Sequence, residues 1–224
     1  NLSREDLDQF ALESHQKAVI ATESNFFDKE ILPIKAKNDK GIEDLVMIDE
    51  GIRFDASLDK LAGLKPVSDG GVITAGNASQ ITDGAAAVLI CNEEGLKKIS
   101  ATPRAEIVSI SVVGDDPVYM LTGPIPASFK ALDSAGLSID DMDIYEVNEA
   151  FAPVPLAWAT ELKADRAKLN VNGGAMALGH PLGATGAKLM TTMLHELERR
   201  NGKYALQAIC EGGGTANATI IKRV

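Results

Sequence analysis

The sequence is short of cysteine and of long apolar runs, and each shortage excludes a class of protein. Its two cysteines, Cys91 and Cys210, are too few for a disulfide framework or a zinc site among 224 residues. Few cysteines suit a reducing compartment, so we expect a cytoplasmic protein. The longest apolar run, from Ala85 to Cys91, is far shorter than the roughly 20 residues of a membrane-spanning helix. We therefore expect no membrane partner.

Basic residues are also scarce. The chain carries 22 lysines and arginines against 32 acidic residues, a formal net charge of −10. A general nucleic-acid binder needs a basic face, so nucleic acid is not an expected partner. The sequence begins with Asn1, and Ser3 directly caps a predicted helix. This start indicates that the chain begins inside a larger protein.

Helix-like and strand-like segments alternate along the chain, which predicts an α/β fold. The predicted helices cover 3–23, 58–61, 93–99, 126–135, 151–162 and 185–199. The predicted strands cover 31–34, 45–48, 84–90, 106–113, 144–147, 168–171, 204–210 and 218–221. Residues 84–90 are a continuous apolar run, typical of a strand that is buried on both faces. Thr102-Pro103-Arg104 interrupts the pattern and predicts a domain boundary.

Three polar side chains follow predicted strands and could meet. Asn148 follows strand 144–147, His180 comes soon after strand 168–171, and Cys210 ends strand 204–210. Ligands of α/β sheets bind at the carboxyl ends of strands. An imidazole can transfer protons, a thiol can be nucleophile or acid, and an amide can stabilise an oxyanion. These three residues therefore predict one catalytic crevice.

Taken singly, each of these residues has an ordinary structural interpretation. Asn148 could cap a helix, Cys210 could be a buried apolar thiol, and His180 could be structural. Glycines surround His180 and follow Cys210, at 179, 183, 186 and 212–214, where backbone amides could approach a ligand. Outside this group we expect His15 and His195 to be exposed and Cys91 to be a buried structural thiol.

Four segments together resemble the signature blocks of the thiolase family. These are Asn148-Glu149-Ala150-Phe151-Ala152, residues 170–186 (NVNGGAMALGHPLGATG), residues 210–214 (CEGGG) and residues 74–87 (TAGNASQITDGAAA). The four blocks stand in the family's order and spacing, and the resemblance covers most of the chain. A glycine-rich block is common on its own, but the set is specific.

The resemblance implies a layered αβαβα fold. Thiolases have two similar halves, each a mostly parallel sheet with helices, and a loop domain inserted in the first half. By this resemblance residues 1–79 are the remainder of the loop domain. Residues 80–100 are the end of the first half, which is only partly present. Residues 101–224 are a complete second half.

The resemblance also implies roles for seven residues. His180 would activate a nucleophilic cysteine and help bind the thioester oxygen, while Asn148 would hold a water in that oxyanion hole. Cys210 would be the acid–base residue, and the Gly212 amide would contribute to a second oxyanion hole. Residues expected to contact the substrate are Ser79 on the pantetheine arm, Phe151 lining the site and Arg53 near the nucleotide.

The implied activity is that of an acetyl-CoA C-acyltransferase of fatty acid metabolism. It would cleave 3-oxoacyl-CoA with CoA, or condense two acyl-CoA molecules in the reverse Claisen reaction, through an acyl-cysteine. Acyl-CoA and CoA would be the substrates, no metal or redox cofactor is implied, and the family resemblance suggests a homodimer or homotetramer. Neither Cys91 nor Cys210 lies in the context of the family's nucleophile, so we expect this chain alone to be catalytically incomplete.

Two alternatives remain at the level of sequence. A ketoacyl synthase is a related condensing enzyme, but it uses two histidines where this chain has His180 and Cys210. A non-catalytic thiolase-like protein that binds CoA or lipid, or that serves in interactions, is the second alternative. The family often has glycine at the position of Ala216, a small change that affects loop shape rather than class.

Overall fold

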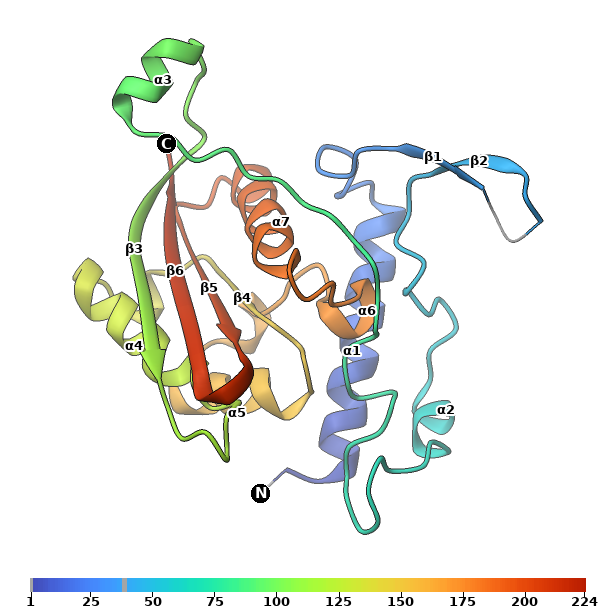
Figure 1. The fold of residues 1–224 in the computed structure, drawn as a ribbon. Helices are drawn as coiled ribbons and strands as arrows, with labels where there is room; N and C mark the ends of the chain where they lie inside the picture. The colour runs from blue at the N-terminus through green and yellow to red at the C-terminus, as the bar shows by residue number, and fades with distance from the viewer. Residues whose placement is uncertain (1, 38–39) are drawn as a thin grey trace.

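A four-stranded mixed sheet forms the centre of the molecule (Figure 1). The computed structural model describes residues 2–37 and 40–224. The strands lie in the order β3 (Ala105–Gly114), β6 (Thr215–Arg223), β5 (Tyr204–Cys210) and β4 (Ile144–Val147). β6 is antiparallel to both of its neighbours, whereas β4 and β5 are parallel. The α/β class is confirmed, and β6 alone runs against the common direction of β3, β5 and β4.

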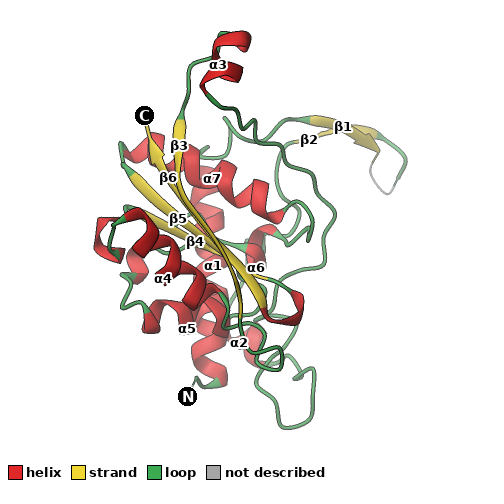
Figure 2. Cartoon of the chain, turned by 60° about the vertical axis from the view of Figure 1, so that its left-hand side comes forward, coloured by secondary structure: helices red, strands yellow, loops and turns green. Residues whose placement is uncertain are grey.

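Helices cover both faces of the sheet, which gives three layers (Figure 2). One face packs against α4 (Pro124–Ala135) and α5 (Pro153–Glu161), and the other packs against α7 (Thr185–Arg200). Strand side chains alternate between the faces. Tyr145 points to the α5 side, where its ring centroid is 5.3 Å from that of Trp158. Ile144 points to the α7 side and packs with Met193.

The long helix α1 (Arg4–Glu23) lies beside this three-layer unit (Figure 1). Ser3 and Asp6 form a capping box at its start, as the sequence predicts. Leu7 and Phe10 join the main apolar core, whereas Ala18 packs against α6 (Ala175–Leu178). The same helix therefore packs against both the main core and α6, which precedes His180.

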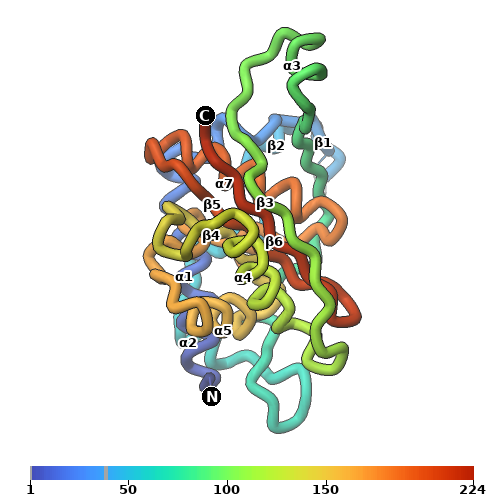
Figure 3. Tube along the Cα trace, turned by 90° about the vertical axis from the view of Figure 1, so that its left-hand side faces the viewer, coloured from blue at the N-terminus to red at the C-terminus, as the bar shows by residue number. Residues whose placement is uncertain are grey.

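The remaining elements are peripheral (Figure 3). They are the antiparallel hairpin of β1 (Ile34–Lys37) and β2 (Glu43–Val46), and the short helices α2 (Leu58–Ala62) and α3 (Glu93–Ile99). Three short 3₁₀ segments cover Ile139–Asp141, Arg166–Lys168 and Gly212–Gly214. No helix in the described part of the chain combines the length and apolar character needed to cross a membrane.

Two predicted strands are not present. Residues 84–90 carry no regular structure, and Leu89 and Ile90 are 79% and 64% exposed. A strand needs a neighbour for its hydrogen bonds, and no described strand pairs with this segment. Lys168 ends the 3₁₀ turn Arg166–Lys168, and Leu169 and Val171 make only isolated parallel bridges, with Tyr145 and Gly173. That segment lies beside β4 as expected but is too irregular to extend the sheet.

The two histidines that were expected to be exposed are not. His15 is 6% exposed on α1, where its Nδ1 accepts a hydrogen bond from the Arg53 backbone amide at 3.1 Å. The His195 side chain is 11% exposed, and its Nδ1 lies 3.4 Å from Glu30. Their charged sequence neighbours suggested solvent, but the helix faces that carry them pack against the chain that follows α1. Cys91 is exposed rather than buried, because residues 84–92 have no covering element.

Candidate active site

The carboxyl ends of β4 and β5 bring the predicted site residues to one edge of the sheet. The two strands are parallel with Val147 opposite Ala208, and the Asn148 amide donates to the Ala208 carbonyl at 3.0 Å. Asn148 therefore leaves β4 where β5 approaches its own end at Cys210. Asn148 and Cys210 thus lie at the carboxyl ends of adjacent parallel strands, where ligands of α/β sheets bind.

His180 and Asn148 are in direct contact. Asn148 Nδ2 lies 3.2 Å from His180 Nε2, and His180 Nδ1 lies 2.6 Å from Thr185 Oγ1. The Thr185 hydroxyl itself donates to the Pro181 carbonyl at 3.0 Å, so its oxygen can only accept from the imidazole. A neutral His180 therefore carries its proton on Nδ1 and presents a lone pair on Nε2 towards Asn148.

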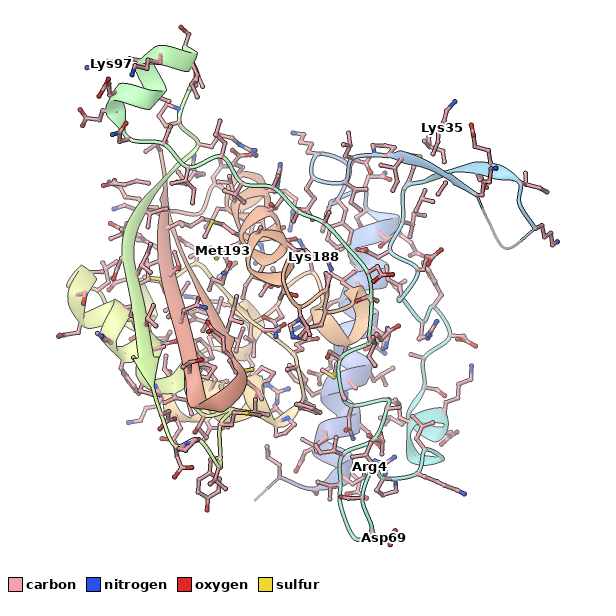
Figure 4. All side chains as sticks on the ribbon, in the orientation of Figure 1. Arg4, Lys35, Asp69, Lys97, Lys188 and Met193 are labelled. Atoms are coloured by element: carbon pink, nitrogen blue, oxygen red, sulfur yellow. The ribbon has the colours of Figure 1, made fainter. Side chains whose placement is uncertain are left out.

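The surroundings of His180 favour that neutral form. Burial lowers the pKa of His180, and the nearby Lys188 ammonium lowers this pKa further. Lys188 belongs to α7 and is labelled in Figure 4. Its Nζ donates to the carbonyl of Leu178 in α6 at 2.6 Å. At neutral pH the imidazole is therefore able to take up a proton at Nε2.

Residues of the 74–83 block hold the His180 loop in place. The His180 amide donates to the Gln80 carbonyl at 3.3 Å, and Gln80 Nε2 donates to the Met176 carbonyl at 2.7 Å. Gly179 has a φ of +80°, and a Cβ there would collide with Thr82. Glycine is therefore required immediately before His180, both for backbone conformation and for this close contact.

Cys210 lies beside the loop that follows Asn148. Its side chain packs with Ala150 and Val154 and is 8% exposed. Burial raises the pKa of the Cys210 thiol, which keeps it protonated at neutral pH. Gly212, two residues after Cys210, is exposed with open space around its α-carbon. A neutral thiol can give up a proton, and an uncovered backbone can approach a ligand.

The three predicted substrate-binding residues all belong to the 74–83 block or contact it. The Ser79 amide donates to the Ala150 carbonyl at 2.9 Å, and Ala78 and Phe151 form an antiparallel bridge. This pairing joins the 74–83 block to the loop after Asn148. Phe151 is 36% exposed. Arg53 is exposed and reaches Gln80 Oε1 at 3.4 Å, so it lies next to the support of the His180 loop.

A buried carboxyl that the sequence did not single out anchors the site from behind. Glu149 is 1% exposed and accepts hydrogen bonds from Ser14 Oγ at 2.7 Å, Asn170 Nδ2 at 2.8 Å and the Met176 amide at 3.2 Å. A Cβ on Gly174 would overlap its carboxyl group. Burial raises the pKa of Glu149, although these hydrogen bonds oppose the rise. Glu149 connects α1, β4 and α6.

Sequence reasoning missed Thr185 and Glu149. Thr185 starts α7 five positions after His180 and could have been suggested by that spacing. Glu149 lies inside a recognised motif, but only the fold reveals its partners. Within residues 2–37 and 40–224, histidine, cysteine and carboxylate side chains form no cluster of three that could hold a metal ion.

Fold and site together define an α/β protein with an imidazole, an amide and a neutral thiol at the carboxyl edge of its sheet. Residues 101–223 match the family described as thiolase, C-terminal domain, and residues 1–94 match thiolase, N-terminal domain. The chain belongs to the thiolase family.

Similar proteins include a steroid 3-ketoacyl-CoA thiolase of Mycobacterium tuberculosis, 55% identical over all of this chain and 54% of its own length. Human mitochondrial 3-ketoacyl-CoA thiolase is 48% identical over 99% of this chain and 56% of its own. The crystal structure of the Bacillus anthracis acetyl-CoA acetyltransferase superposes with a TM-score of 0.94 at 43% identity, covering 100% of this chain and 57% of that one. The structure of the human mitochondrial enzyme in complex with CoA superposes with a TM-score of 0.91 at 45% identity, covering 100% and 55%. The chain thus spans about half the length of the relatives it matches.

Proposed function

We propose that this chain supplies the acid–base and oxyanion residues of a thiolase, which cleaves 3-oxoacyl-CoA with CoA or runs the reverse condensation. The observation that carries the proposal is the 3.2 Å contact between Asn148 Nδ2 and His180 Nε2 at the sheet edge where β5 ends in Cys210. Relatives that align along the whole chain are named as thiolases, and one related structure contains CoA.

In the proposed reaction His180 Nε2 takes the proton of a nucleophilic cysteine. The thiolate adds to the 3-oxo carbon, and the resulting oxyanion is stabilised by His180 and by a water on Asn148. When the bond between C2 and C3 breaks, its electron pair moves to the acetyl-CoA fragment, and the Cys210 thiol protonates that carbon. The acyl group stays on the nucleophile until the CoA thiol gives its proton to the Cys210 thiolate and its sulfur attacks the thioester carbon. The released cysteine thiolate then recovers its proton from His180.

The nucleophile is assigned to a segment outside these 224 residues. Cys210 is buried and has the proposed role of the acid, whereas Cys91 is exposed on the irregular segment before α3. We therefore expect this chain alone to show no turnover. In the complete site the Gly212 amide would face the enolate oxygen, and Ser79 would contact the pantetheine arm. Phe151 would line the site, and Arg53 would lie towards the nucleotide.

Cys210→Ala tests the proposal in the product of the complete coding sequence, with acetoacetyl-CoA and CoA as substrates. We expect thiolysis to fall by about 10²–10⁴-fold, because the carbon acid–base step loses its proton donor. Exchange of labelled CoA with acetyl-CoA requires only the acyl-enzyme, so it should persist. Cys91→Ala is the matched control and should change thiolysis by less than about twofold.

Two outcomes would contradict the proposal. Unchanged thiolysis in Cys210→Ala would remove that residue from the chemistry. Measurable CoA binding by the wild-type product without any acetyl exchange would favour the alternative of a non-catalytic, thiolase-like CoA binder.

A further inference from the structure

A small cavity lies behind the contact between Asn148 and His180, on the side of the sheet that α7 covers. Its volume is about 10 Å³, close to the space that one water molecule occupies. Polar side chains of β4, of the turn after it and of α7 line part of the wall: Glu146, Asn148, Thr185, Lys188 and Thr192. The rest of the wall is backbone and apolar side chains of residues 173–179 and Leu189.

Two buried oxygen atoms of this wall lack a partner among the described residues. They are Glu146 Oε1 and Asn148 Oδ1, on side chains that are each 1% exposed. A buried polar atom without a hydrogen bond costs about 1–3 kcal/mol, so native proteins rarely leave two together. A polar cavity of one water's size between two such atoms is the usual setting of a structural water.

The orientation of the Asn148 side-chain amide depends on what its Oδ1 atom contacts. Thr185 fixes the His180 proton on Nδ1, so Nε2 can only accept, and Asn148 must turn its NH₂ group towards it. Asn148 Oδ1 then has to face away from His180. Without a donor there, Oδ1 is left buried and unsatisfied, which weakens the orientation in which Nδ2 points towards His180.

Burial and nearby charges shift the pKa of Glu146. Burial raises the pKa of Glu146 well above its usual value, and the neighbouring carboxylates Glu149 and Glu30 raise it further. Groups of either sign face it from α1, α7 and the segment after α1. These are Lys17, which lowers this pKa, and Glu196, which raises it, with Lys188 on the cavity wall. The residue opposite Glu146 on β5 is the neutral Gln207.

We propose that a water molecule in this cavity bridges Glu146 Oε1 and Asn148 Oδ1 and thereby holds the Asn148 amide towards His180. The water donates one of its two O–H groups to each of these oxygens. Glu146 is thus a positioning residue, acting on the reaction only through Asn148. This inference rests on the function proposed above.

The test compares Glu146→Gln with Glu146→Met in the product of the complete coding sequence. Both variants keep the length of the side chain, but only glutamine can hydrogen-bond to the water. We expect Glu146→Gln to keep kcat within about threefold and to retain the wild-type pH profile. Glu146→Met should lower kcat by about ten- to a hundredfold with little change in KM, because the oxyanion donor is misplaced while substrate contacts remain. Gln207→Met is the matched control. It removes a buried amide directly across the strand pair that does not line the cavity, and it should leave kcat within about twofold.

A crystal structure of the wild-type product supplies a readout that does not depend on activity. We expect one ordered water within hydrogen-bond distance of Glu146 and Asn148. An empty cavity would overturn the inference, and so would Glu146→Met with normal kcat, or Glu146→Gln impaired as strongly as Glu146→Met. A wild-type product without acyl-transfer activity would instead overturn the proposed function, and the crystal structure would still decide whether the water is present.

Discussion

At the scale of single residues, the site depends on one chain of hydrogen bonds with a single direction. The chain runs from Asn148 through His180 and Thr185 to the Pro181 carbonyl. Each member has the donors and acceptors needed for only one arrangement when the imidazole is neutral. Thr185 therefore orients His180 as a carboxylate orients the histidine of a Ser-His-Asp triad, but without adding a negative charge.

Replacing Thr185 by valine tests this assignment. Thr185→Val removes the Nδ1 acceptor at nearly constant volume, so the imidazole is free to change tautomer. We expect kcat of the complete product to fall by about ten- to a hundredfold at similar KM. Thr185→Ser keeps the hydroxyl and should recover most of the rate. Equal activity in the valine and serine variants would show that Nδ1 needs no partner.

At the scale of elements, α1 approaches the sheet where glycine leaves room for it. The Ser14 carbonyl would collide with a Cβ on Gly173, and Ser14 Oγ accepts from the Gly174 amide at 3.0 Å. The Glu149 carboxyl occupies the place where Gly174 would carry a side chain. The Asn172-Gly173-Gly174 run is therefore a packing requirement, although its sequence position suggests a ligand-binding turn.

Adding one methyl group at Gly174 should destabilise the folded state. Gly174→Ala forces Glu149 away from its three donors, and we expect the free energy of unfolding to drop by about 1–3 kcal/mol. Gly183→Ala lies in the same motif, has nothing within 4 Å and should change stability by less than about 0.5 kcal/mol. Urea denaturation of both variants measures the difference. Similar losses in the two would contradict the packing argument.

At the scale of the whole molecule, buried titratable groups act on stability in opposite directions. Glu146 and Glu149 have raised pKa values, so their protonation favours the folded state as pH falls. His15 has a pKa lowered to about 4, chiefly by burial and then by Arg53, so its protonation favours unfolding. Its usual pKa is 6.5, so the unfolded chain binds this proton first as pH falls.

His15→Gln isolates the histidine contribution. Above about pH 6.5 the histidine is neutral in both states, and the offset between wild type and variant should be constant. As pH falls from about 6.5 to about 4, wild type should lose about 1–2 kcal/mol relative to His15→Gln, after allowance for solvent screening. Carboxyl contributions cancel in this comparison. Denaturation at pH 7.5, 5.5 and 4 measures the trend, and parallel curves would refute the burial of a neutral His15.

Much of the fold and part of the site could be predicted from the sequence. The ranges of β4 and β5 match their predictions, because apolar runs bounded by turns fix such strands locally. The segment 84–90 was wrongly predicted as a strand, since pairing depends on a neighbour that no local pattern reveals. The Asn148 position follows from the end of β4, whereas the segment before His180, which was expected to be a strand, makes only isolated bridges. Thr185, Glu149 and Glu146 did not stand out, because their importance lies in partners from distant parts of the chain.

The hydrogen bond from Ser14 to Glu149 joins residues that are 135 positions apart in the sequence. At translation rates of about 5–20 residues per second, α1 leaves the ribosome roughly ten seconds before its carboxylate partner is made. Throughout that interval the face of α1 that will carry Ser14 has no Gly174 or Glu149 to pack against. The support of the site therefore forms only after residue 174 has been made, and this part of the fold should assemble in one step rather than gradually.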